Sequence, residues 1–266
     1  MEKKLPGVFP ATKKNGTVYY RSSITYKQKH ISLGSYDTPS KAFGAYLEAS
    51  SIIEKKSLSL NDYSIHRVLP FGKWVTLINF RDNNIYIATP IYLRQNYFEY
   101  FLSPEQVLKF DIDDLFYYSS RKIMQRGRHF FVADYGMQVN IANRYGIKNY
   151  AVQGRDYRFV NGDPCDFRYE NIEIFNKYHG VIRKESKKGV KYVTKIHING
   201  NYTVGTYLTD TEAAIAYNKA IDILKKAGVT KNFVPNYLED LSPSVYADIY
   251  SKLHISSKIL NYTVSD

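Results

Sequence analysis

The sequence is poor in cysteine and has no long apolar run. Its 266 residues include one cysteine, Cys165, which excludes a disulfide framework and favours a reducing compartment. No run of about 18 apolar residues occurs, so we expect no membrane span. No secretory signal pattern is found either, and we therefore expect a cytoplasmic protein.

Motifs for catalysis and metal binding are also missing. The six histidines include no pair at metal-ligand spacing, and with a single cysteine this excludes a zinc site. No Gly-rich phosphate loop precedes a predicted helix, and no Gly-x-Ser-x-Gly sequence occurs. We expect neither a cofactor nor a bound metal.

Positive charge, by contrast, is abundant and is confined to two segments. The chain has a formal net charge of +12. Residues 1–60 contain 10 Lys/Arg against 4 Asp/Glu, residues 178–231 contain 10 against 4, and the remainder contains 17 against 17. The two segments hold a charge of +6 each, so we expect each of them to contact a polyanion, with duplex DNA as the first candidate.

The two basic segments repeat one pattern. Each opens with a Gly-Val pair, Gly7-Val8 or Gly180-Val181, and continues through a basic turn into β-branched and aromatic residues that are typical of strands. A hairpin that ends at Gly34 or Gly205 then precedes a predicted helix with one apolar stripe. From these glycines on, the copies align without a gap at Tyr36/Tyr207, Thr38/Thr209, Ala42/Ala213, Ala45/Ala216, Tyr46/Tyr217, Ala49/Ala220 and Ile52/Ile223.

Three short motifs in each copy carry a resemblance to a known family. In the second copy they are Tyr178-His179-Gly180-Val181, Val204-Gly205-Thr206-Tyr207 and Ala213-Ala214-Ile215-Ala216-Tyr217. In the first copy they are Pro6-Gly7-Val8, Leu33-Gly34-Ser35-Tyr36 and Ala42-Phe43-Gly44-Ala45-Tyr46. Both copies resemble the Apetala-type (ethylene-response-factor) DNA-binding domain, over about 100 residues in all. The resemblance implies an α+β fold in which two small domains, each a three-stranded sheet plus a helix, flank the middle of the chain.

In that family the sheet enters the major groove of double-stranded DNA. The resemblance therefore implies that outward strand residues read bases, through the hydroxyl, amide, imidazole and cationic groups that can bond to base edges. The implied readers are Arg21, Ser23, Thr25, His30 and Ser32 in the first copy, and Arg183, Lys184, Lys195, His197, Asn201 and Thr203 in the second. Lysines of the two basic turns are expected to contact phosphates: Lys13, Lys14, Lys187 and Lys188.

A second resemblance lies between the repeats. Residues 161–172 read Asn-Gly-Asp-Pro-Cys-Asp-Phe-Arg-Tyr-Glu-Asn-Ile, which is similar to the core of HNH homing endonucleases. That chemistry needs a histidine to activate water, and carboxylate and Asn/His ligands for a divalent ion. Arg158 and Phe159 stand at the catalytic positions, Phe167 replaces the Asn of the motif, and only residues 175–177 separate Ile174 from the second repeat. We interpret the segment as an HNH scaffold that has lost catalysis.

Other interpretations stay open. Residues 161–166 are also a plain Asn-Gly/Asp-Pro turn. A nicking endonuclease with rearranged ligands would use His129 or His179 with Asp163 or Asp166. A third possibility is an interaction protein whose Tyr-rich middle, around residues 98–101 and 116–118, binds a host or phage protein while the repeats anchor it to DNA.

Four segments are expected along the chain: the first repeat at 1–60, a degenerate HNH-like (ββα) middle at 61–176, the second repeat at 177–234 and a helical tail at 235–266. In the middle we predict strands over Trp74–Phe80, Ile85–Tyr92 and His129–Tyr135. Asp111, Asp113 and Asp114 are expected to start and flank a helix over Leu115–Ile123 rather than to bind a metal. The tail is predicted to hold a helix that Ser242-Pro243-Ser244 caps and that runs to Leu253.

Together these features predict a sequence-specific protein that binds a bipartite site on double-stranded DNA, with no enzymatic activity. The resemblances imply a transcriptional regulator of a bacteriophage or other mobile element, derived from a homing endonuclease. In a bacterial host it is expected in the cytoplasm, associated with the nucleoid.

Overall fold

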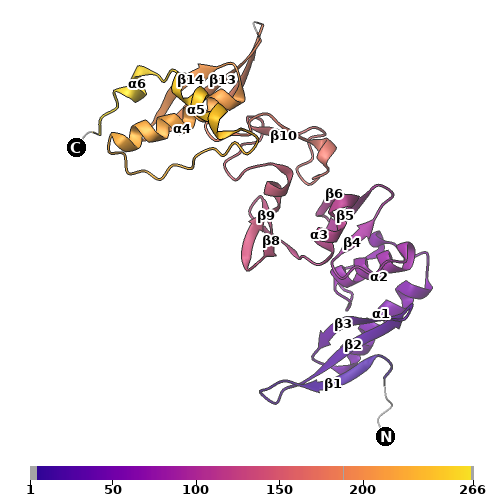
Figure 1. The fold of residues 1–266 in the computed structure, drawn as a ribbon. Coiled ribbons are helices and arrows are strands. Elements are labelled where there is room, and N and C mark those ends of the chain that lie inside the picture. Colours follow the sequence, from indigo (N-terminus) through magenta and orange to yellow (C-terminus); the bar gives the residue numbers. More distant parts are fainter. Residues whose placement is uncertain (1–4, 188, 265–266) are drawn as a thin grey trace. The chain divides into compact units, whose positions relative to one another are not determined.

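The protein has an α+β fold built from small antiparallel sheets. The structure, a computed structural model, describes residues 5–187 and 189–264 (Figure 1). Within these residues there are four three-stranded sheets and one two-stranded sheet. The chain divides into two compact units. Unit 1 holds the residues up to Ile141 together with Asp163–Asn171, and unit 2 holds Ala142–Gly162 together with the residues from Ile172 on.

The first repeat forms a three-stranded sheet and a helix in unit 1. Strands β1 (Val8–Thr12), β2 (Val18–Tyr26) and β3 (Lys29–Tyr36) pair in that order, and helix α1 (Pro39–Glu54) packs against them. The buried face of α1 consists of Ala42, Ala45, Ala49 and Ile52, which confirms the predicted stripe. Thr38 begins the helix by accepting a hydrogen bond from the Lys41 amide at 3.2 Å.

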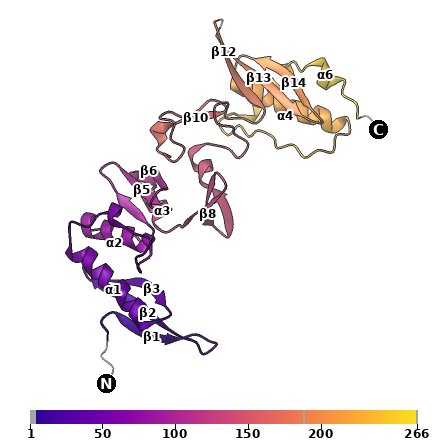
Figure 2. The same ribbon diagram turned by 180° about the vertical axis from the view of Figure 1, so that it is seen from behind.

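The second repeat forms the same arrangement in unit 2. Its strands are β12 (Val181–Ser186), β13 (Gly189–His197) and β14 (Asn201–Tyr207), followed by helix α4 (Asp210–Lys226), as Figure 2 also shows. Thr209 and Glu212 make a reciprocal capping box at the start of α4. Alanines again form the buried stripe of the helix, because their small side chains let it lie close to the sheet.

The two Gly-Val pairs have one structural role. Gly7 and Gly180 both have positive φ, 68° and 75°, and their carbonyls accept hydrogen bonds from the amides of Ser23 (3.0 Å) and Lys195 (2.7 Å). A β-bulge lies at each of these partners, between Ser22 and Ser23 and between Thr194 and Lys195. A Cβ at either glycine would meet a backbone oxygen and the ring of Tyr46 or Tyr217. The repeat in sequence is therefore a repeat in backbone geometry.

The rest of unit 1 differs from the predicted strands. Residues 74–80 belong to helix α2 (Phe71–Asn83), so the predicted strand there is wrong. Nearly every residue of that segment is buried, and continuous burial cannot distinguish a strand from a buried helix. The strand predicted over Ile85–Tyr92 is wrong for most of its length, since only β4 (Ile91–Leu93) is extended. Asn79 bonds both the Ile85 carbonyl and the Leu93 amide, which holds the intervening loop in place.

The middle continues with further short elements. They are β5 (Tyr97–Phe101), β6 (Val107–Asp111), α3 (Leu115–Ser119), β7 (Ile123–Arg126), β8 (His129–Asp134) and β9 (Met137–Asn140), with 3-10 turns at η1 (Leu60–Asp62), η2 (Ile112–Asp114), η3 (Ile141–Tyr145) and η4 (Tyr169–Asn171). The predicted strand at residues 129–135 matches β8. The helix predicted to reach Ile123 ends at Ser119, because Ile123 begins β7 and packs in the core.

Unit 2 is completed by β10 (Tyr157–Phe159), β11 (Ile172–Ile174), α5 (Pro243–Lys252) and α6 (Ser257–Leu260). Ser242 caps α5 as predicted, accepting a hydrogen bond from the Val245 amide at 3.5 Å. No helix within residues 5–187 and 189–264 combines the length and the apolar character that a membrane span requires.

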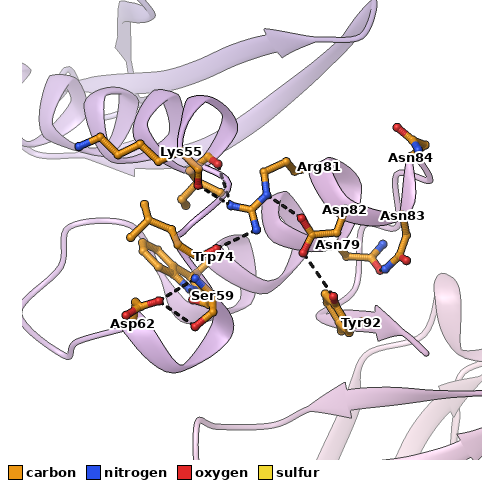
Figure 3. Close-up of polar contacts among 12 residues, drawn as sticks. Lys55, Ser59, Asp62, Trp74, Asn79, Arg81, Asp82, Asn83, Asn84 and Tyr92 are labelled. Atoms are coloured by element: carbon orange, nitrogen blue, oxygen red, sulfur yellow. Dashed lines mark hydrogen bonds and ion pairs between the residues drawn. The ribbon is translucent and has the colours of Figure 1, made fainter. Parts of the chain in front are cut away.

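A buried arginine fastens α1 to α2 in unit 1. Arg81 on α2 donates to the carbonyls of Ile52 (3.0 Å), Lys55 (2.9 Å) and Leu58 (2.7 Å), and its Nε binds Asp82 at 2.7 Å (Figure 3). The first two carbonyls lie at the C-terminal end of α1, where helical partners are lacking. Arg81 therefore caps the C-terminal end of α1 and holds α2 against it.

Candidate nucleic-acid interface

One face of the second sheet is covered by α4 and the other is open. Val181, Thr194, Ile196 and Val204 are buried on the helix side. Because side chains alternate along a strand, the intervening residues lie on the opposite side. We call this the second outer face; it consists of Ile182, Lys184, Lys191, Val193, Lys195, His197, Asn201, Thr203 and Thr206.

Cross-strand pairing places the polar members of this face next to one another. Lys184 is opposite Lys191, Lys195 is opposite Thr203, and His197 is opposite Asn201. The His197 Nδ1 and Asn201 Oδ1 atoms lie 3.2 Å apart. The face thus carries three lysines and contains no acidic residue, so it offers an uncompensated positive surface to an anion.

Five of the six residues predicted to read bases in the second copy lie on this face, and Arg183 does not. Arg183 follows Ile182 and precedes Lys184 in β12, so its side chain alternates to the opposite side. There it forms an ion pair with Glu185 and is partly buried. The expectation that Arg183 points outward beside Lys184 is therefore wrong.

Lys191 and Thr206 also lie on the second outer face, although they are not among the residues predicted from the motifs. Lys191 lies four residues before Lys195 in the same strand, so strict alternation along β13 would have identified it. Thr206 follows the β-bulge, where the pairing shifts by one residue between Thr203 and Gly205. A bulge cannot be located from one sequence by alternation alone.

The equivalent face of the first sheet, the first outer face, has a different composition. It consists of Phe9, Ala11, Tyr19, Arg21, Ser23, Thr25, His30, Ser32 and Ser35. Arg21 supplies its only formal charge. Thr25 and His30 pair across the strands, with Oγ1 and Nδ1 3.5 Å apart.

Ser23 occupies the position equivalent to Lys195 but is buried. Only 7% of its surface is exposed, so the expectation of an exposed Ser23 is wrong. Ser23 lies on the middle strand opposite Ser32 of β3, and its side chain is short. Lys195, on the middle strand of the second sheet, has a long side chain and is exposed.

The lysines of the first sheet, Lys13, Lys14, Lys27 and Lys29, lie at or beside its hairpin turns rather than on its outer face. Lys13 and Lys14 are exposed in the β1–β2 turn, as predicted from the basic turn. Lys27, in the β2–β3 turn, and Lys29, the first residue of β3, extend over aromatic rings of unit 1, with the Lys29 ammonium 5.0 Å from the Tyr86 ring centroid. In the second repeat Lys187 is exposed at the turn equivalent to Lys13, and Lys188 lies outside the described residues.

The residues of the HNH-like segment make structural contacts. Asp166 is fully buried and accepts two hydrogen bonds from Arg168, at 2.9 and 2.6 Å, and this interaction raises the pKa of the guanidinium. Asp163 accepts a hydrogen bond from the Cys165 amide at 2.9 Å and lies 3.6 Å from the Lys109 ammonium. Asn171 donates to the Asp166 carbonyl at 2.8 Å. Both carboxylates therefore stabilise the loop itself.

The residues that stand where the HNH resemblance would place functional side chains also make structural contacts. Arg158 pairs with Glu173 across the β10–β11 ladder, at 2.6 Å. Phe159 is buried in unit 2. In unit 1, Phe167 packs against Phe110 and Phe130, with ring centroids 5.7 and 6.1 Å apart.

The two candidate histidines of a rearranged nuclease lie in different units. His129 is exposed at the start of β8 in unit 1. His179, in unit 2, stacks on Tyr150 at 4.5 Å, and burial lowers the pKa of its imidazole. The search of residues 5–187 and 189–264 found no group of three or more His, Cys, Asp or Glu side chains placed to hold a metal ion. Asp111 accepts a hydrogen bond from the Tyr169 amide at 2.7 Å.

The Tyr-rich clusters of the middle lie mostly in the core. Phe98, Tyr100 and Tyr118 are at most 1% exposed, and Phe98 and Tyr118 stack around Phe110. Phe116 is the exception, with 90% of its surface exposed. These aromatic residues chiefly build unit 1.

A scan against protein-family models matched no family, and searches of curated proteins and of solved structures returned no match. The function is therefore inferred from the residues of this chain and their geometry.

Proposed function

We propose that the protein binds double-stranded DNA through the outer faces of its two repeated sheets, with the second outer face supplying most of the affinity. The observation that supports this is the grouping of Lys184, Lys191 and Lys195 on one open sheet face that lacks acidic residues. Neutralising phosphates with such lysines releases counterions, which is the main source of affinity for DNA.

The other polar members of the face suit base recognition. The major groove admits a β-ribbon, and its base edges present donors and acceptors to side chains. Asn201 can bond an adenine in two places, and Lys195 can bond the acceptors of a guanine. His197 and Thr203 are paired with these two residues across the strands. Lys184 and Lys191 lie toward the β12–β13 turn and suit phosphates.

The two outer faces differ, so the proposed target has two unlike half-sites. The second face carries three lysines, whereas the first carries one arginine together with an exposed Phe9. Linking the two contacts in one chain makes the second binding event intramolecular and raises the affinity beyond that of either face.

We extend the proposal to the cellular role that the sequence resemblances imply. The protein would be a non-catalytic regulator from a phage or other mobile element, derived from an HNH endonuclease and located on the nucleoid. The structural contacts of Asp163 and Asp166 support the non-catalytic part, because metal ligation would compete with them.

The test is selection of bound sequences from a random duplex pool, followed by anisotropy titrations of the best sequence at several salt concentrations. If the two faces contact about eight phosphates, log K should fall against log salt with a slope near −7. Replacing Lys184 and Lys191 by Ala should flatten the slope by about two. Replacing Lys225 and Lys226, exposed on the last turn of α4, should leave it unchanged. The proposal fails if the protein does not bind duplex DNA at low salt.

A further inference from the structure

A third three-stranded sheet, β7–β8–β9, carries a positive patch that lies outside both repeats. Residues 119–133 contain four cations, Arg121, Lys122, Arg126 and Arg128, and no acidic residue. The residues outside the two repeats contain 17 Lys/Arg against 17 Asp/Glu, and this overall balance hides the local excess. The patch belongs to unit 1, whose repeated sheet has one formal charge on its outer face.

The inner face of this sheet is anchored in the core. Ile123 pairs with Val132 across the strands, and both are buried, as is Phe130. The Ile123 amide donates to the Tyr100 hydroxyl at 3.0 Å, and Phe130 packs edge-on against Phe167. The sheet is thus a rigid platform, and residues of alternate register lie on its open side.

The β7–β8 hairpin turns tightly and its tip is open. Arg126 is opposite His129, with Gly127 and Arg128 between them, and Gly127 has a φ of 57°. A positive φ at the first central residue alone matches a two-residue hairpin of type II′. A Cβ at Gly127 would meet no heavy atom within 4 Å, so the described chain leaves room around the tip.

One cation of the group is engaged and three are available. Arg121 binds Asp134 at 3.0 Å and lies over the Tyr117 ring at 4.2 Å. Lys122, Arg126 and Arg128 are exposed and have no acidic partner within the described residues. Like charges this close repel one another, and an approaching polyanion would relieve that repulsion.

We propose that the β7–β8 hairpin is a third DNA contact, in which Arg126 and Arg128 bind the phosphate backbone. A guanidinium presents a planar fork of donors that matches phosphate, which favours these two arginines over Lys122 as the main ligands. This contact rests on the proposed DNA binding. It would give unit 1 two further positive charges for binding phosphates, in addition to the single charge on its first outer face.

The test compares full chains in anisotropy titrations against duplex DNA over a series of salt concentrations. Replacing Arg126 and Arg128 together by Ala should flatten the slope of log K against log salt by about two and weaken binding roughly tenfold or more at 0.1 M salt. The double Lys variant should keep most of the slope. A matched control replaces Lys55 and Lys56 by Ala, which removes two exposed cations from the same unit.

The outcomes separate the two proposals. If the unaltered chain does not bind DNA, the proposed function fails and this contact with it. If the unaltered chain binds and the R126A/R128A variant keeps the same slope and affinity as the Lys55/Lys56 control, the hairpin contact alone is refuted. Thermal unfolding of each variant reports its folding, and the open tip predicts an unchanged midpoint.

Discussion

The two repeats share a backbone and differ in almost everything that surrounds it. In both, a glycine with positive φ, a bulge between the second and third strands and a stripe of alanines accompany the packing of the helix on the sheet. The outer faces differ instead: the position that holds buried Ser23 in one holds exposed Lys195 in the other. The two copies thus share the elements that define the fold and differ on the open face.

The helices of the two repeats are also held in place by different chemistry. Glu48 on α1 and Lys219 on α4 occupy equivalent positions. Glu48 accepts hydrogen bonds from the amides of Val68 (3.1 Å) and Leu69 (2.8 Å). Lys219 instead donates to backbone carbonyls at the C-terminal end of α5, including that of Tyr250 at 2.7 Å. Helix α1 is closed by Arg81, whereas α4 is followed by Gly228 with a φ of 88°. The same sheet-and-helix arrangement therefore packs against a different segment of the chain in each repeat. The side chain that makes this contact is acidic in the first repeat and basic in the second.

The largest expected effect tests whether the shared glycine has the same importance in both repeats. Gly7→Ala and Gly180→Ala should each destabilise their own unit by about 3–6 kcal/mol, because an added Cβ combines backbone strain with overlap. It would lie 2.7 Å from the Ser23 oxygen or 2.5 Å from the Lys195 oxygen. Urea unfolding measures the change.

Gly16→Ala is the matched control for the glycine variants. Gly16 also has positive φ, 84°, but nothing lies within 4 Å of an added Cβ. It should cost only about 1 kcal/mol, from the backbone strain alone. Equal losses for Gly7→Ala and Gly16→Ala would show that the contact with the helix is unimportant.

The next prediction tests the difference in how the C-terminal ends of α1 and α4 are capped. Arg81→Ala should destabilise unit 1 by about 2–4 kcal/mol, because it leaves the carbonyls of Ile52, Lys55 and Leu58 without their donor. Unit 2 should unfold as before. Hydrogen exchange resolved by segment measures both, and an unchanged exchange rate at the end of α1 would contradict the role assigned to Arg81.

A smaller effect tests the difference between the outer faces. Lys184→Ala with Lys191→Ala should flatten the salt slope of DNA binding by about two, whereas Arg21→Ala should flatten it by about one, in proportion to the phosphate contacts removed. Anisotropy titrations of the selected duplex measure both slopes. Equal changes would mean that the two faces contribute alike despite their unequal charge.

The smallest effect is a pH dependence confined to the second repeat. Burial lowers the pKa of His179, so the folded state holds this imidazole neutral while the unfolded state takes up a proton near its ordinary pKa of about 6.5. Stability should therefore fall as the pH drops through and below that value. The first repeat has Pro6 at this position. His179→Gln should remove the dependence, as urea midpoints at pH 5 and pH 7.5 would show.

The sequence predicted the parts of the fold in which one periodicity dominates. The helical stripe from Ala42 to Ile52 and the cap at Ser242 follow from local spacing. The segment around Trp74 was misread because full burial removes the alternation that separates a strand from a helix.

The candidate site could be predicted only in part. Alternation identified Lys195, His197, Asn201 and Thr203 as neighbours on one face. The burial of Ser23 was not visible from strand spacing. Arg183 and Lys184 are adjacent in β12, so alternation alone indicates that only one of them can face outward. The β7–β8 patch was hidden because its charge is balanced by acids elsewhere outside the two repeats.

The central claim, that the second outer face contacts DNA, is tested most directly by lysine acetylation footprinting of the full chain with and without duplex DNA. Mass spectrometry would report the reactivity of each lysine. We expect protection of Lys184, Lys191 and Lys195, with Lys225 and Lys226 reacting as in the free protein. Equal reactivity of the three outer-face lysines in both states, under conditions where the DNA is bound, would contradict the account.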